Sequence, residues 1–113
     1  MTKHARTKSA RLAEKLLRIR LALGLSQSGL LEHLGFSEEL FRSNVSQYEL
    51  GTREPALPVL LQYARAANVW VDVLIDDELD LPEELPSLTK SEGITRKLRL
   101  TAKKSSASSR GRS

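Results

Sequence analysis

Three glycines divide the first half of the chain into short segments with helical periodicity. Gly24 ends the first apolar-periodic segment, Gly35 ends a second one, and Gly51 follows a third. Ser26 is a good N-cap for a helix over residues 27–34, and Gly35 allows the chain to turn sharply because glycine adopts positive φ without strain. The spacing therefore predicts two short helices joined by a tight turn.

The segment before Gly51 has one apolar face and one polar face. Phe41, Val45 and Tyr48 recur at i, i+4 and i+7, so the pattern predicts that they line the inward face. The outward groups are hydroxyls, amides and one guanidinium, which can donate to and accept from base edges, although a solvated polar surface is the alternative. These candidate base-reading residues are Arg42, Ser43, Asn44, Ser46 and Gln47.

A spaced set of ten residues lies between positions 20 and 55: Arg20, Gly24, Ser26, Gln27, Gly35, Ser46, Glu49, Gly51, Arg53 and Pro55. This set resembles the XRE or phage-repressor-like (Cro-like) helix-turn-helix family. The resemblance covers roughly residues 10–78 and implies an all-α, lambda-repressor-like bundle of about five helices. It implies that residues 27–34 form the positioning helix and that the recognition helix ends at Leu50. Members of the family mostly bind operators as dimers and regulate transcription.

The chain departs from the family pattern within this motif. Ser28, Gly29 and Leu31 replace residues that are usually helix formers or small, and Gly29 costs about 1 kcal/mol against alanine in a helix. The segment from Gly35 to Ser46 is also longer than usual. Either Ser37 caps a recognition helix with an extra turn, or residues 37–41 form a separate turn and the helix starts near Arg42.

The resemblance also implies roles for residues beside the recognition helix. Arg20 is expected to form an ion pair with Glu49, with two solvated charges as the alternative. Gln27 is expected to hold a DNA phosphate together with the free amides of its helix N-terminus. Thr52 and Arg53 are expected to contact phosphate from the loop after Gly51, although an ion pair of Arg53 with Glu54 or Glu49 is the alternative.

Three further helices are expected around this motif. The first begins at Ala10, with an apolar stripe of Leu12, Leu16, Ile19 and Leu23, and it leaves Arg11, Lys15 and Arg18 exposed. The fourth follows Pro55 and Pro58, with Tyr63 and Arg65 toward its flanks and Asn68 as its cap. Its expected stripe is Leu57, Leu60, Leu61, Ala64 and Ala67.

The segment Val69–Asp77 has strand-like composition, but the family pattern makes it a short fifth helix. Val69, Val73 and Leu74 are then expected to close the core. Trp70 is expected to be partly exposed, where it suits either a dimer contact or core packing.

Charge is sorted into blocks along the chain, which has a net charge of +4. Residues 1–9 are expected to form a basic, disordered arm in which Lys3, Arg6 and Lys8 are candidates for phosphate or minor-groove contacts. Residues 10–78 are expected to form the domain, residues 79–92 an acidic linker containing Pro82 and Pro86, and residues 93–113 a basic, largely disordered tail. Within the tail, residues 94–101 suit a basic helix or a strand equally. The two basic ends of the chain suit arms that bind a polyanion, and the alternative is that they only keep the protein soluble.

Several function classes have little support in the sequence. The chain has no cysteine, and His4 and His33 lack ligand-spaced neighbours, so we expect no metal site and no cofactor. No nucleophile with a histidine partner and no phosphate-binding glycine loop is present, so we expect no enzyme. No apolar run approaches a membrane span, and no signal-peptide pattern follows the basic N-terminus, which favours a soluble cytoplasmic protein.

The sequence therefore predicts a transcriptional regulator that binds double-stranded DNA, and more specifically a repressor acting as a homodimer. Arg42 suits guanine and Gln47 suits adenine, each through two hydrogen bonds. The alternative is an antitoxin that neutralises a partner toxin through residues 79–113 and represses its own operon. RNA binding suits only the basic tail, because the core lacks an aromatic stacking surface.

Overall fold

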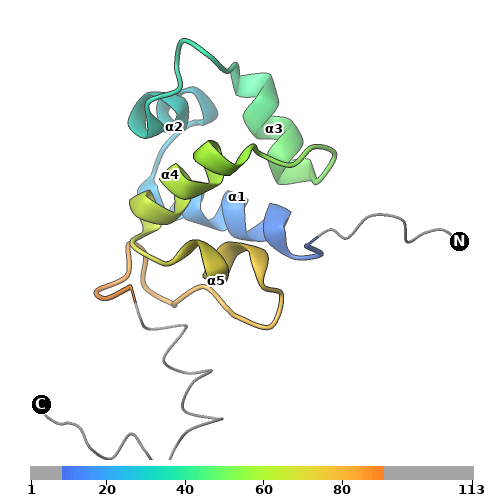
Figure 1. Ribbon diagram of the computed structural model, residues 1–113. Helices are drawn as coiled ribbons and strands as arrows, with labels where there is room; N and C mark the ends of the chain where they lie inside the picture. Colours follow the sequence, from blue (N-terminus) through green and yellow to red (C-terminus); the bar gives the residue numbers. More distant parts are fainter. Residues whose placement is uncertain (1–8, 91–113) are drawn as a thin grey trace, which may run out of the picture.

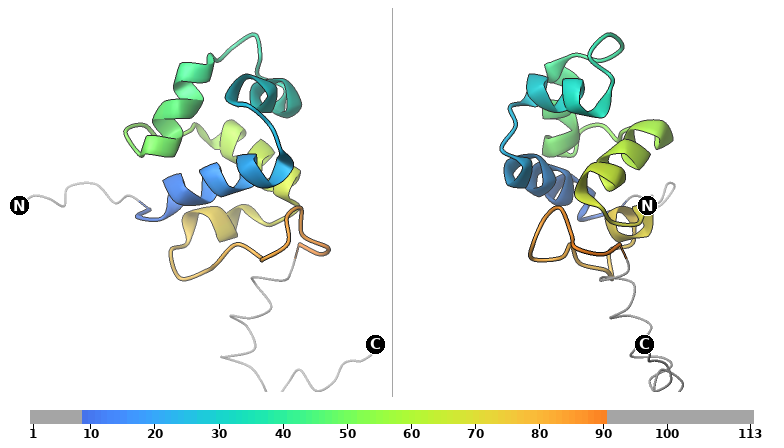
Figure 2. Two further views of the ribbon diagram at one scale, coloured as in Figure 1. Left: turned by 180° about the vertical axis from the view of Figure 1, so that it is seen from behind. Right: turned by 90° about the vertical axis from the view of Figure 1, so that its left-hand side faces the viewer.

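The first helix runs through the middle of the fold. The computed structural model describes residues 9–90, and α1 spans Leu12–Leu23. Figures 1 and 2 show α1 between α3 on one side and α5 on the other, with α4 packed across it. The predicted apolar stripe of α1 is confirmed. Leu12, Leu16 and Ile19 lie in the core, and Leu23 packs against it.

The described residues form an all-helical, compact arrangement with no strand in residues 9–90, as the sequence predicts. Helix α2 spans Gln27–Leu34, α3 spans Arg42–Leu50, α4 spans Leu57–Ala67 and α5 spans Val71–Ile75. One hydrophobic core joins residues from all five helices, and the segment after α5 adds Leu79 and Leu81 to it.

The short connections around α2 and α3 follow from local backbone chemistry. Ser26 caps α2 as predicted, because its Oγ accepts a hydrogen bond from the Gly29 N–H at 2.9 Å. Gly35 (φ 88°) and Gly51 (φ 81°) end α2 and α3 in the left-handed region, where an L side chain is strained. The predicted helix ends are therefore confirmed at both glycines.

The predicted stripe of α4 is confirmed at Leu60, Ala64 and Ala67, which are buried, and is wrong at its other positions. Leu57 is 77% exposed and Leu61 is also exposed, whereas Tyr63, predicted at a flank, is fully buried. Apolar residues surround more than half of this helix, so periodicity alone does not select the inward stripe. The core instead takes the stripe Val59, Leu60, Tyr63, Ala64 and Ala67. Asn68 ends α4 with φ 57°, which confirms it as the cap.

The fifth helix is short and closes the core as the sequence predicts. Val69, Val73 and Leu74 are buried, and Trp70 at the N-cap is about half exposed. The Nζ of Lys90 lies 5.1 Å from the centre of the Trp70 ring, a cation–π geometry.

Lys15 was predicted to be exposed, and this prediction is wrong. Its side chain is buried (2% exposed), and Nζ donates to the carbonyl oxygens of Val73 at 2.7 Å, Asp76 at 3.1 Å and Leu79 at 2.8 Å. Burial lowers the pKa of Lys15, with the charge of Arg11 as the next cause. The three carbonyls take all three ammonium protons, which offsets the cost of removing the charge from water.

Arg11 and Arg18 act with Lys15 on the same side of α1. The Arg11 guanidinium donates to the carbonyl of Asp77 and to the carboxylate of Asp80, at 2.9 and 2.7 Å. Arg18 is exposed as predicted, but its Nη2 donates to the carbonyls of Pro82 and Glu83. We call residues 76–90 the strap, because these basic residues bind it along α1.

The strap replaces the free linker predicted from residue 79 onward. Leu79 and Leu81 are core residues, Pro82 and Ser87 are buried, and Figure 2 shows the strap running beside α1. The Ser87 N–H donates to the Ala67 carbonyl at 2.9 Å, so the strap also reaches the end of α4. The packed domain therefore extends beyond residue 78. Of the predicted arm, residues 1–9, only Ser9 is described, and its Oγ donates to the Ile75 carbonyl at 2.7 Å, so it is part of the packed domain. Residues 1–8 and the predicted tail from residue 93 lie outside the described residues.

We expect Lys15→Met to lower the free energy of unfolding by about 2–4 kcal/mol, because it leaves three buried carbonyls without their donor. Chemical denaturation measures the difference, with Arg65→Met on the exposed side of α4 as the matched control. Equal stability of the Lys15→Met and Arg65→Met variants would show that the carbonyls do not depend on the ammonium group.

Asp77 should make the free energy of unfolding depend on pH in the acidic range. Its carboxylate accepts the N–H groups of Ala10 and Arg11, which holds its pKa below the ordinary 3.8. A lowered folded-state pKa means that the unfolded chain binds more protons, so this stabilisation is present above about pH 4 and is lost as pH falls through the folded-state value.

We therefore expect Asp77→Asn to lower Tm at pH 7 and to approach the wild-type Tm as pH falls below about 4. Thermal melts from pH 7 to pH 2 test this, with Glu83→Gln, an exposed carboxyl on the strap, as the control. A Tm difference between Asp77→Asn and wild type that stays constant over this range contradicts the assignment.

Candidate nucleic-acid interface

The predicted ion pair between α1 and α3 is present. Arg20 Nε donates to Glu49 Oε2 at 2.6 Å and Nη2 donates to Oε1 at 3.1 Å, so both carboxylate oxygens are engaged. The side chains are 15% and 7% exposed, respectively. The hydrogen bond to Glu49 is the main cause that raises the pKa of Arg20.

Two further contacts connect this pair to the start of α2. Arg20 Nη1 donates to the Leu25 carbonyl at 2.9 Å, and Gln27 Nε2 donates to Glu49 Oε1 at 3.1 Å. Arg20 and Glu49 thus hold α1, the start of α2 and α3 in one arrangement. The same contact occupies part of the amide of Gln27, which was predicted to hold a phosphate.

Tyr63 adds a buried hydroxyl close to this network. Burial raises the pKa of Tyr63, and the charge of Glu49 raises it further. The hydroxyl oxygen is buried and finds no hydrogen-bond partner among residues 9–90. The Tyr63 hydroxyl therefore stays protonated at neutral pH, and it adds no charge beside the Arg20–Glu49 ion pair.

Helix α3 begins at Arg42, which decides between the two alternatives for the longer segment. Residues 37–39 form a separate turn, and α3 has no extra N-terminal turn. Val45 and Tyr48 are buried as predicted. Phe41 was predicted on the same inward face, but it precedes the helix in extended conformation and is 75% exposed.

The candidate base-reading residues are not equally accessible. Arg42, Ser43 and Gln47 are exposed on α3, whereas Ser46 is half-buried. Asn44 is also half-buried, and its Oδ1 accepts the Phe41 N–H at 2.9 Å. The side-chain amide oxygen of Asn44 therefore stabilises the start of α3, as asparagine side chains commonly do near helix N-termini.

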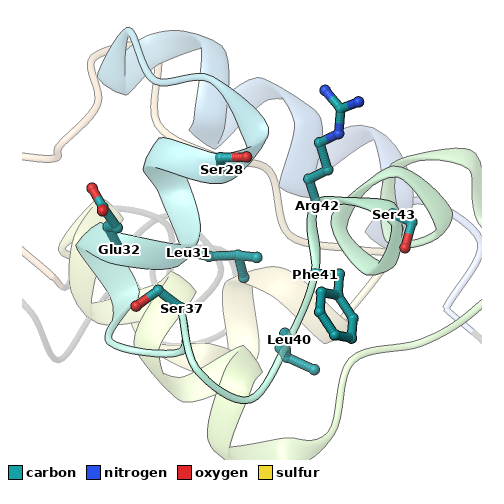
Figure 3. A pocket seen from close by; sticks show the side chains of 8 residues that line it. All are labelled: Ser28, Leu31, Glu32, Ser37, Leu40, Phe41, Arg42 and Ser43. Atoms are coloured by element: carbon teal, nitrogen blue, oxygen red, sulfur yellow. The ribbon is translucent and has the colours of Figure 1, made fainter.

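A shallow hollow of about 560 Å³ lies between α2 and the start of α3. Figure 3 shows Phe41 and Leu40 on one side of it and Arg42 extending in another direction. Five further residues line the hollow, one of them apolar and the others polar or charged: Leu31, Ser28, Glu32, Ser37 and Ser43.

The loop after α3 contains the remaining candidate phosphate contacts. The Thr52 N–H donates to the Gln47 carbonyl at 3.0 Å, which continues the turn at the end of α3, and the Thr52 side chain is exposed. Arg53 is exposed, and no ion pair joins it to Glu54 or Glu49 within residues 9–90. Burial raises the pKa of Tyr48, and the charge of nearby Arg53 partly opposes this increase.

Arg53 also lines a second hollow of about 270 Å³, between the start of α1 and the turn after α3. Ser9 and Ala10 lie on the other side of this hollow. The described chain therefore begins beside the loop that contains Thr52 and Arg53. Lys3, Arg6 and Lys8, the predicted arm contacts, lie outside the described residues.

Sequence reasoning missed two apolar residues on this surface. Phe41 and Leu50 are both exposed, at the two ends of α3. Leu50 falls close to Ser43 and Gln47 in helical rotation, opposite Val45 and Tyr48, so its exposure follows from the same periodicity. Phe41 had no comparable signal, because the point where α3 begins could not be fixed from the sequence.

Within residues 9–90, no group of three or more His, Cys, Asp or Glu residues is arranged to hold a metal ion. No helix in this part of the chain is long and apolar enough to cross a membrane. Comparisons of the chain with protein-family models, with curated proteins and with solved structures gave no match.

We expect Arg20→Ala to lower the free energy of unfolding by about 3–5 kcal/mol, because it leaves the nearly buried Glu49 carboxylate without its partner. The double variant Arg20→Met, Glu49→Leu should lose clearly less, since it strands no charge. Chemical denaturation of both variants makes the comparison. A free energy of unfolding of Arg20→Ala close to that of wild type would contradict a structural role for the pair.

Proposed function

We propose that this chain is a sequence-specific DNA-binding regulator of transcription and that α3 lies in the major groove. The proposal rests on one observation: the exposed face of α3 is polar, and the opposite face holds the helix against the core and α1. Val45 and Tyr48 pack the inward face of α3 into the core, and Glu49 is tied to Arg20. A helix held on one side and polar on the other matches the geometry of a groove-reading helix.

Three exposed side chains of α3 suit base edges in the major groove. Arg42 can donate two hydrogen bonds to O6 and N7 of guanine, and Gln47 can form a pair with adenine. Ser43 can donate to or accept from either neighbouring base. Ser46 and Asn44 are less accessible, so we assign them a smaller share of the base contacts than the sequence suggested.

Phosphate contacts on either side of α3 would set its register on the duplex. Gln27 begins α2, where backbone N–H groups lack helical partners, and its amide can exchange its bond with Glu49 for a phosphate. Thr52 and Arg53 supply a hydroxyl and an exposed cation beyond the other end of α3. Repulsion of Glu38 and Glu39 by phosphate favours a tilt that keeps the turn before α3 away from the backbone.

We further propose that the chain acts as a homodimer and represses transcription in the cytoplasm. Trp70 and Ile75 are partly exposed at the two ends of α5 and offer apolar area for contact with a second copy. Two copies would then read half-sites about 34–36 Å apart on one face of the duplex.

The antitoxin alternative is less well supported than the sequence suggested. It requires an extension that is free to wrap a partner, but residues 79–90 pack onto the domain through Leu79, Leu81 and Ser87. Only residues after the strap would then be available for a toxin, and they lie outside the described residues.

Selection of duplexes from a random pool by the full-length protein, at about 150 mM salt, tests the proposal because nonspecific phosphate binding is weak at that ionic strength. We expect an inverted repeat. Recovery of no motif, with binding that disappears as salt rises, would refute sequence-specific regulation.

Two substitutions should separate base contacts from phosphate contacts. We expect Gln47→Ala to relax preference at one base pair by about 1–3 kcal/mol, whereas Arg53→Ala should weaken all duplexes alike and make the salt dependence shallower. Repeated selection and titration at several salt concentrations measure both effects. An unchanged motif for Gln47→Ala would place α3 outside the groove.

A further inference from the structure

We infer that Phe41 is a specificity-determining residue of this interface and that its ring contacts the 5-methyl group of a thymine in the major groove. The inference rests on the proposed function and adds a residue that the polar pattern of α3 does not include. Phe41 is 75% exposed, although a phenylalanine side chain gains free energy from burial. It lies at the N-cap of α3, immediately before the exposed Arg42.

The backbone of Phe41 is held in place, so its ring projects from a fixed position. Its N–H donates to Asn44 Oδ1 at 2.9 Å, and its carbonyl accepts the Asn44 N–H at 2.8 Å. Both bonds tie Phe41 to the first turn of α3. An aromatic group on a fixed backbone loses little conformational entropy when it binds, which favours a recognition role.

The surroundings of the ring favour an apolar occupant over an anion. Leu31 and Leu40 line the same hollow as Phe41, and Figure 3 shows Leu40 beside it. Glu32 and Arg42 both line the hollow, so its charged side chains have opposite signs and do not select an anion. A neutral methyl group is therefore a better partner for this side of the hollow than the DNA backbone.

The major groove supplies such a group at one base only. Thymine presents a 5-methyl group there, and phenylalanine is among the side chains that contact it. The N-terminal residues of a recognition helix are those that meet base edges, and Phe41 and Arg42 occupy that end of α3. In Figure 3 their side chains leave the backbone in different directions, which suits contacts to two neighbouring base pairs. A thymine beside an arginine-read guanine is the expected pattern.

The test uses the full-length protein and the duplex obtained by selection. Each thymine of one half-site is replaced in turn by uracil, which removes only the methyl group, and Kd is measured by fluorescence anisotropy. We expect one replacement next to the guanine to weaken wild-type binding about three- to ten-fold, the range for one buried methyl group. The Phe41→Ala variant should bind the thymine and uracil duplexes equally, and Phe41→Leu should keep part of the preference.

Leu57→Ala is the matched control, because Leu57 is similarly exposed but lies on α4. It should keep the wild-type preference for thymine, and melting curves of all variants check that they fold. Equal binding of thymine and uracil duplexes by wild type at every position would overturn the inference while leaving the selected motif intact. An undiminished thymine preference in Phe41→Ala would also overturn it, because another residue would then contact the methyl group. Failure to select any motif would instead refute the proposed function, and this inference with it.

Discussion

The bidentate contact between Arg20 and Glu49 fixes the orientation of α3. Both side chains are nearly buried, so the pair tolerates little displacement before an uncompensated charge appears. Because Arg20 also holds the Leu25 carbonyl and Glu49 also accepts from Gln27, the constraint reaches the start of α2. The exposed face of α3 is a consequence of this arrangement as much as of its own sequence.

Helix α1 organises the fold through charged groups on two of its sides. Arg20 faces α3, whereas Lys15 faces α5 and the strap, about 140° away in helical rotation. The two cations solve different problems. Arg20 meets a carboxylate with matched planar geometry, while the ammonium of Lys15 satisfies three backbone carbonyls that would otherwise be buried without donors.

Features set by neighbouring residues could be predicted from the sequence. The Ser26 cap and the glycine ends of α2 and α3 depend on backbone conformations that few residues adopt easily, so local sequence identifies them. The Arg20–Glu49 pair was predicted only through the resemblance of spaced residues to a known family. Within the candidate site, the exposure of Arg42, Ser43 and Gln47 follows from helical periodicity.

Features set by distant partners could not be predicted in this way. A lysine in an amphipathic helix normally faces water, and nothing near Lys15 in the sequence indicates acceptors about sixty positions away. The acidic composition of residues 79–92 suggested a linker, although Leu79 and Leu81 contribute to the core. The half-buried state of Asn44 and the exposure of Phe41 both depend on where α3 begins, and composition does not define that point.

The strap also constrains when the fold can form during synthesis. The acceptors of Lys15 lie 58 to 64 positions later in the chain, so a nascent polypeptide exposes this cation until residue 79 has left the ribosome. Helices α1 to α4 can emerge earlier, but the carbonyls that satisfy Lys15 cannot. The domain can therefore be completed only after nearly all of the described chain has been translated. If translation stops before the strap, the Lys15 ammonium on α1 lacks the carbonyl acceptors that it has in the folded domain.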